Sequence, residues 1–315
     1  MNAGSVIWLG QVQELSIDDS ENKLINHYMG TANRNWDAME QGPRDVTGTL
    51  GVHPTDLRLA FYSIGSIVEV SGATGTIATH GVTETNSDVW QSPFVSGTGK
   101  LTTPFSFTLE DSKQAPGTNR NFIRTVGGAI PNTVTVTATQ GEKVMLDVDF
   151  IGQTLAFSSG TTTTLVDSGN SPYLWNDCSL TLAGSAMDTA KEISFEINNN
   201  LTASHYLNGS RDIAAPIVGN RDYTVNVTMD LDASDAAFLY NDYYKSNGSF
   251  NMTFDLNADA RVAGSQHTTF YMSGCKITSM ENPSVLEGTT ETTIEVRPMN
   301  VTGSAYDTVH KYNPW

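Results

Sequence analysis

The sequence predicts a mainly β protein that contains two similar halves. Most segments alternate apolar and polar residues with a period of two and are rich in Val, Thr, Ile and Phe, which is the pattern of strands with one buried face. Gly, Asn and Ser separate these segments, as turns require. The stretch ELSIDDSENKLINHYMG at 14–30 returns as EISFEINNNLTASHYLNG at 192–209, and such a repeat indicates a duplicated structural unit.

The repeat continues along the chain in a constant order. Three further pairs of stretches match: GPRD (42–45) with GNRD (219–222), FSFTLED (105–111) with FNMTFDL (250–256), and NFIRTVGGAI (121–130) with TTFYMSGCKI (268–277). The last pair places Gly127 opposite Gly274. Because matches in one order are better explained by duplication than by chance, we expect the two halves to share one fold.

The clearest strands lie at 132–150, where two alternating runs flank Gln140-Gly141-Glu142 and predict a hairpin. The stretches 221–231 and 289–296 alternate in the same way. A helical pattern follows a strand-like stretch in each half, at 53–65 and at 232–245, and each begins with residues suited to a helix start.

Two stretches have no counterpart in the repeat, and they set the expected domain boundaries. Residues 67–104 form an insertion in the first half, and 158–171 is a linker by its Ser, Thr and Gly content. We therefore expect a first domain at 1–157, a linker and connecting strand at 158–188, and a second domain at 189–315.

The charge balance argues against nucleic-acid binding. The chain has 34 Asp and Glu against 17 Lys and Arg, a net charge of −17, and no basic stripe with interleaved aromatic residues. Such a surface repels DNA, or it serves solubility alone, for instance in a salty medium. We expect neither a secretion leader nor a membrane anchor.

No spacing typical of catalysis or metal binding is present. The sequence lacks a phosphate-binding loop, a zinc-protease helix, a nucleophile elbow and an EF-hand. Cys178 and Cys275 share no metal-ligand spacing and are expected to be small, partly buried residues. His27 and His205 recur in the repeat, each before a Tyr, which favours a structural role. We expect no enzyme, cofactor or metal.

The second half, from EISFEINNNL to FNMTFDLNAD, resembles the major tail tube proteins of long-tailed phages and archaeal tailed viruses. The similar features are an Asn run after a strand, a Gly-x-Arg before the next strand, an acidic helix start and a final glycine-containing hairpin. The resemblance extends to the first half at the level of pattern.

This resemblance implies two tandem β-sandwich domains, each with one flanking α-helix. It further implies that three two-domain chains form a pseudo-sixfold ring, and that rings stack into a virion tail tube through which viral DNA passes without specific binding. The implied partners are other copies of the chain and the tail terminator, distal tail and tape-measure proteins. Assembly is expected in the host cytoplasm.

Two groups of residues are candidates for this role. Carboxylates on alternating strands are candidates for lining the lumen, although the same positions suit ordinary solubility charge: Asp147, Asp149, Asp255 and Glu295. Apolar residues in the insertion are candidates for contacts with another ring or chain, unless the insertion folds back on its own domain: Val89, Trp90 and Phe94.

Two alternatives stay open at this point. One is a distal tail or baseplate hub protein of the same fold, which caps a tube instead of polymerising. The other is a secreted β-sandwich binding module, for which Trp90, Trp175 and Trp315 are candidate aromatic platforms.

Overall fold

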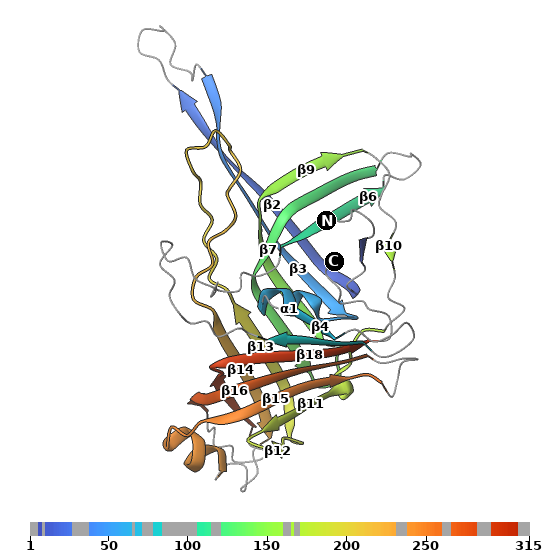
Figure 1. The fold of residues 1–315 in the computed structure, drawn as a ribbon, viewed down its shortest axis with the longest axis vertical. Coiled ribbons are helices and arrows are strands. Elements are labelled where there is room, and N and C mark those ends of the chain that lie inside the picture. The colour runs from blue at the N-terminus through green and yellow to red at the C-terminus, as the bar shows by residue number, and fades with distance from the viewer. Residues whose placement is uncertain are drawn as a thin grey trace.

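The structure is a computed structural model, and it describes residues 6–7, 10–26, 38–64, 67–70, 78–83, 106–114, 121–159, 165–166, 171–230, 238–259, 266–281 and 291–307. Within these residues the protein is mainly β with short helical segments, as the sequence predicts (Figure 1).

The first half contains nine strands and one α-helix among the described residues: β1 (Val6–Ile7), β2 (Gly10–Asn26), β3 (Ala38–Pro54), α1 (Arg58–Ile64), β4 (Ile67–Val70), β5 (Ala78–Thr83), β6 (Phe107–Gln114), β7 (Asn121–Thr139), β8 (Met145–Gly152) and β9 (Thr154–Ser158). The remaining elements follow in order: β10 (Leu165–Val166), η1 (Trp175–Asp177), β11 (Cys178–Leu182), β12 (Ser185–Ala186), β13 (Ala190–Asn198), β14 (Asp222–Asp230), η2 (Phe238–Lys245), β15 (Phe250–Asn257), β16 (Gln266–Met280), β17 (Glu291–Arg297) and β18 (Asn300–Asp307).

Strand pairing joins most of the chain into one 16-stranded sheet. Its main path runs β12-β11-β15-β16-β17-β14-β13-β7-β8-β3-β2. The halves meet where β13 pairs antiparallel with β7, from Glu192 opposite Thr139 to Asn198 opposite Thr133. We call this pairing the internal joint. The sheet therefore continues from one half of the chain into the other.

Matching irregularities occur in the two halves. The β2–β3 pairing has a register shift between Val12 and Glu14, and the β13–β14 pairing has one between Ala190 and Glu192. Glu14 and Glu192 are partners in the sequence repeat. Because a β-bulge redirects a strand, shifts at matching positions bend the two strand pairs at the same point.

The long strands β7 and β16 also match. The β6–β7 pairing shifts between Phe107 and Leu109, and the β15–β16 pairing shifts between Phe250 and Met252. Farther along, β7 pairs with β8 and β9, whereas β16 pairs with β17 and β18. The same set of strand pairings thus occurs in both halves of the chain.

A glycine marks the bend of each long strand. Gly128 has φ 63° and Gly274 has φ 65°, a backbone region that residues with a Cβ rarely occupy. Ala129, the residue after Gly128, lies opposite Phe107 in β6. Cys275, the residue after Gly274, lies opposite Phe250 in β15 in the same way. Gly128 therefore holds the position of Gly274, and the alignment of Gly127 with Gly274 was wrong by one residue. Alternation does not reveal which of two adjacent glycines has positive φ.

The predicted hairpin at 132–150 is confirmed. Strands β7 and β8 pair antiparallel, and the Glu142 amide donates to the Thr139 carbonyl at 3.1 Å across the turn. Gly141 in this turn has φ 84°, which glycine adopts without strain. The strands expected at 221–231 and 289–296 correspond to β14 and β17.

Helix α1 exists but is shorter than the predicted 53–65. It begins at Arg58, because β3 remains paired with β2 as far as Pro54. The Phe61 ring is fully buried and packs edge-on against Phe270 of β16, with ring centroids 5.6 Å apart. The helix of the first half thus packs against a strand of the second half.

The helix expected at 232–245 is present in its second part, because Phe238–Lys245 forms a π-helical segment, η2. Its Leu239 is fully buried, and its Tyr243 ring lies 4.9 Å from that of Phe250, centroid to centroid. The preceding residues of the prediction lie outside the described part of the chain.

Strands β2 and β3 form a long hairpin that extends beyond the rest of the sheet (Figure 1). The connection between β13 and β14 runs beside it. The Arg44 amide donates to the Arg211 carbonyl at 2.9 Å, and the Arg211 guanidinium donates to Gln41 Oε1 at 2.6 Å. Arg44 also forms an ion pair with Asp19 at 2.6 Å. The Arg211 side chain and a backbone hydrogen bond thus join the hairpin to the second half, while the Arg44–Asp19 pair links the two strands of the hairpin.

Part of the 67–104 insertion also pairs with the second half. Strand β5 pairs with β4 on one side and with β18 on the other, from Ala78 opposite Asp307 to Thr83 opposite Thr302. The insertion therefore leaves the sheet of its own half and extends that of the other half, within the same chain.

Candidate functional surface

One face of the sheet is apolar and buried, and the other is polar. Strand β8 shows the alternation: Leu146, Val148 and Phe150 are 0%, 1% and 1% exposed, whereas Asp147 and Asp149 are exposed. This agrees with the prediction that Asp147 and Asp149 share one face and Val148 lies on the other.

Strand pairing carries this polar face across both halves. Residues directly opposite each other in a sheet lie on the same face. Asp149 lies opposite Thr49 and Thr133 within the first half. Across the internal joint, Thr137 lies opposite Ser194, which faces Asn226 and then Glu295. We call the surface formed by the outward residues of β2, β3, β8, β7, β13, β14 and β17 the polar face.

Carboxylates and hydroxyl groups dominate the polar face. Seven of its acidic residues, none of them buried, are Glu14, Asp18, Asp147, Asp149, Glu192, Glu196 and Glu295. Thr and Ser occupy many of the positions between them. Such a surface offers negative charge and exchangeable hydrogen bonds to water.

The carboxylates of this face affect one another. Partial desolvation raises the pKa of Asp147, and the negative charges of Asp149 and Glu14 raise it further, while the neighbouring His53 acts in the opposite direction. Like charges close together favour protonation of one of them. The face therefore concentrates negative charge at β8.

Two cations near the polar face, Arg297 and Lys191, are paired with carboxylates. The Glu295 carboxylate accepts hydrogen bonds from Arg297 at 3.0 Å and from Thr278 at 2.9 Å, and these bonds lower its pKa. The Lys191 ammonium lies 2.7 Å from Asp230 and 2.5 Å from Glu291. Paired cations of this kind are less available to an outside anion.

Of the four carboxylates predicted to act together, the structure brings three onto one face. Asp255 lies apart on β15, where its Oδ1 atom is 2.6 Å from His267 Nε2 and 2.5 Å from Thr269 Oγ1. Both partners are on β16. Alternation gives the face of a residue within its strand but not the part of the sheet to which the strand belongs.

The predicted contact residues Val89, Trp90 and Phe94 lie outside the described residues. The described parts of the same insertion are β4 and β5. Of the candidate aromatic platforms, Trp175 is 43% exposed on η1, and Trp90 and Trp315 are not described.

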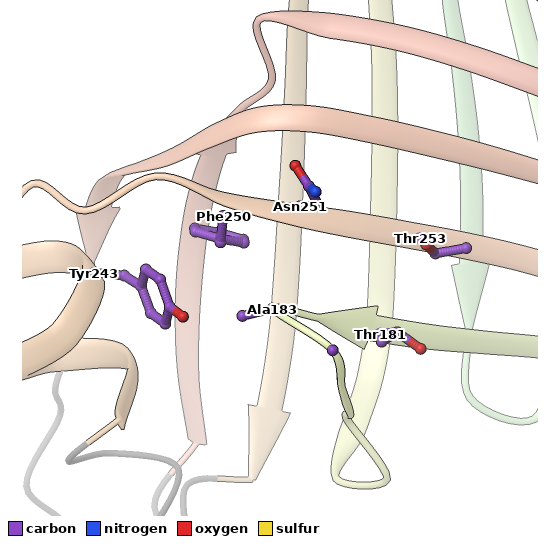
Figure 2. A pocket seen from close by; sticks show the side chains of 7 residues that line it. Thr181, Ala183, Tyr243, Phe250, Asn251 and Thr253 are labelled. Atoms are coloured by element: carbon purple, nitrogen blue, oxygen red, sulfur yellow. The ribbon is translucent and has the colours of Figure 1, made fainter.

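The described residues contain no arrangement typical of catalysis. A hollow of about 460 Å³ between η2, β11 and β15 is lined by Thr181, Ala183, Gly184, Tyr243, Phe250, Asn251 and Thr253, and Figure 2 shows its side chains. This lining has no carboxylate, histidine or thiol. Burial raises the pKa of the Cys178 and Cys275 thiols to about 12, so neither is a ready nucleophile. No cluster of metal-ligating side chains occurs in the described part of the chain.

The contacts that fasten the β2–β3 hairpin were not predicted from the sequence. They include Arg211, which forms an ion pair with Glu21, and His205, whose Nε2 atom lies 3.0 Å from Asp45. The sequence did contain a signal for the Arg44 contacts, because Arg44 and Arg221 occupy matching positions in the repeat. Arg221 likewise binds the segment that follows β13, donating to Asn199 Oδ1 at 2.6 Å.

The polar face and the repeated strand pairings agree with a comparison of the sequence with known protein families. The family model described as phage tail tube protein matches residues 31–303, which is most of the chain and includes both halves. The chain belongs to the phage tail tube protein family. No curated protein matches the sequence.

Membership of this family makes the chain a structural protein of the virion tail that assembles with other copies and with other tail components. Neither α1 nor η2, the longer helical segments among the described residues, has the length and hydropathy of a bilayer-crossing helix.

Proposed function

We propose that three chains form one ring of the tail tube, and that each chain supplies two of six similar units. The observation that carries this proposal is the recurrence of the same strand pairings and bulges in two halves that are joined edge to edge. The two units lie side by side in one sheet, so each is related to the next by one rotation. Repeating the same contact between further units closes a symmetric ring.

The two units correspond to the domains at 1–157 and 189–315, with 158–188 between them. Strand β11, from the intervening segment, pairs with β15 and adds to the second unit. The β4–β5 hairpin adds to the second unit only. Since the units differ in this way, the ring has threefold symmetry.

The polar face lines the lumen in this proposal, with Asp147, Asp149 and Glu295 among the residues that face the DNA. A ring of three chains has a formal charge of 3 × −17 = −51, which repels the phosphates of a passing duplex. The lumen must be about 20 Å wide to admit duplex DNA. A surface that holds no phosphate allows the DNA to slide.

Rings stack into the tube through surfaces that include the 67–104 insertion, with Val89, Trp90 and Phe94 as contact residues. Buried aromatic residues supply much of the binding energy of protein interfaces. The tube ends on tail terminator and distal tail proteins, and it encloses the tape-measure protein before DNA enters.

Electron microscopy of the purified protein, combined with native mass spectrometry, tests the proposal. We expect tubes of stacked rings with three chains in each ring. Rings of six chains would overturn the two-unit arrangement. Rings that never polymerise at any salt concentration would instead identify a hub protein of the same fold, and a monomer at all concentrations would overturn self-assembly.

A further inference from the structure

Among the described residues, the open strand edges of the large sheet include those of β2 and of the end of β16. Strand β2 ends the main path, so it pairs with β3 on one side only. The last residues of β16, Lys276–Met280, pair with β17 on one side only. An open edge exposes a row of backbone donors and acceptors that can bind another strand.

The counterparts of these two edges are paired with each other. Strand β2 matches β13, because Glu14 and Glu192 follow matching bulges. The end of β16 matches the second part of β7. Ser279 comes directly after a register shift in the β16–β17 pairing, and Thr133 comes directly after one in the β7–β8 pairing. Since β13 and β7 form the internal joint, the chain contains the template for a joint between its two open edges.

Apolar side chains of β2 are less buried than their counterparts in β13. In β13, Ile193 is 5% exposed and Phe195 is completely buried within the sheet. Their counterparts in β2 are Leu15 and Ile17, which are only partly buried, and the nearby Val12 is 47% exposed. No proline interrupts β2, and proline is a common means of blocking an edge.

We propose that β2 of one chain pairs antiparallel with the end of β16 in the next chain, in the register of the internal joint. Ser20 then lies opposite Ser279 as Asn198 lies opposite Thr133, and Asp19 lies opposite Met280 as Ile197 lies opposite Val134. The partner is a second copy of this chain. This inference rests on the proposed ring and identifies the surface that closes it.

The structure does not pair these two edges with each other within one chain, so the proposed contact lies between chains. Within one chain the two edges are at different places on the path, separated by β17, β14, β13, β7, β8 and β3. The contact is head to tail, because β2 and β16 are different surfaces, and repetition of such a contact closes a ring when the rotation allows it.

One pair in the joint between chains carries like charges where the matching pair of the internal joint does not. The register places Asp18 opposite Glu281, where the internal joint has Glu196 opposite Thr135. Like charges directly opposite each other in a sheet destabilise the pairing. The internal joint therefore has no such repulsion, while ring closure depends on salt that screens it.

Disulfide trapping between two variants tests the proposed register. Ser20 and Ser279 are both exposed, so Ser20→Cys and Ser279→Cys are tolerated, and opposite positions in a sheet lie within the Cα distance of a disulfide. A mixture of the two single variants, assembled and oxidised, is expected to give a disulfide-linked dimer on a non-reducing gel. The double variant is expected to give a linked trimer.

Ser20→Cys mixed with Thr278→Cys is the matched control, because Thr278 is also exposed but one residue out of register. We expect at least tenfold less cross-linking with this control. Assembled tubes without cross-linking, or with equal cross-linking in the control, would overturn the edge pairing and leave the tube function intact. Failure of all the proteins to assemble in any salt would overturn both.

Discussion

Gly128 and Gly274 occupy the same point in two copies of one bent strand. Their φ angles are 63° and 65°. Each glycine directly precedes a residue that is paired with a Phe next to a register shift, Ala129 with Phe107 and Cys275 with Phe250. The backbone bend therefore recurs at matching positions of β7 and β16, and it directs one part of each strand into the sheet that carries the polar face and the other part away from it.

Replacement of Gly274 by Ala is expected to destabilise the protein by more than the same change at Gly141. Both residues have positive φ, which costs an alanine about 1 to 2 kcal/mol. A Cβ at Gly274 would also lie 3.0 Å from Met299 Sδ, whereas one at Gly141 would meet nothing within 4 Å. Urea unfolding of the two variants measures the difference. Equal losses would show that Met299 moves aside without cost.

The acidity of Asp147 leads to a prediction about pH. Its folded pKa is raised, so the charged form is less stable in the fold than in the unfolded chain. Asp147→Asn is therefore expected to stabilise the protein slightly at pH 7. This gain should shrink as the pH falls through the folded pKa and vanish below the unfolded value of about 3.9. Urea unfolding at pH 7 and pH 4 checks the sign, and a gain that grows at low pH would contradict it.

The polar face should become adhesive to DNA if its charge is reversed. We expect tubes of the double variant Asp147→Lys, Asp149→Lys to retain short duplex DNA at low salt, because these positions would then bind phosphates. Asp188→Lys is the control, since Asp188 is exposed on the turn between β12 and β13, outside the polar face. Pelleting of tubes with fluorescent DNA measures retention. Equal retention by tubes of the control would contradict the placement of β8 in the lumen.

Removal of the repulsion in the proposed joint should promote assembly. Glu281→Thr recreates the carboxylate–threonine pair that Glu196 and Thr135 form in the internal joint. Relief of a like-charge pair is worth up to about 1 kcal/mol, so we expect assembly at a several-fold lower protein concentration in low salt. Glu142→Thr removes the same charge from an exposed turn and is the control. Light scattering across a salt series measures both, and equal shifts would indicate a general charge effect.

The sequence was sufficient to predict the local elements of the fold. Alternation located the hairpin of β7 and β8, and side-chain identity located counterparts such as Glu14 and Glu192, because these patterns depend on neighbours in the chain. The start of α1 was wrong because the pairing of β3 with β2 extends to Pro54. Pairing with a distant strand overrides local helix signals.

The internal joint and the position of Asp255 were not predictable from the same patterns. Strands β7 and β13 alternate like most others, so their sequences do not specify each other as partners. Asp255 and Asp149 both lie in strands with alternating polar and apolar residues. However, β15 pairs with the first part of β16, and the bend at Gly274 separates that part from the polar face. Both features depend on the three-dimensional path of the sheet.

The 67–104 insertion can be tested by a deletion that respects its pairing with the second half. Since β5 completes the edge of β18, the deletion should begin after Thr83. Replacement of 84–99 by a short Gly-Ser linker keeps β4 and β5, and it removes Val89, Trp90 and Phe94. We expect stable trimers that no longer stack into tubes, because the proposed contacts between rings are lost.

A longer deletion, of 72–99, provides the comparison for this experiment. It removes β5 as well and leaves the β18 edge open, so we expect a lower midpoint of urea unfolding in addition to the loss of tubes. The shorter deletion should leave that midpoint unchanged. Electron microscopy and unfolding curves of both variants separate the two roles of the insertion. Normal tubes from the shorter deletion would show that residues 84–99 do not hold the rings together, and the contact between rings would then have to lie elsewhere.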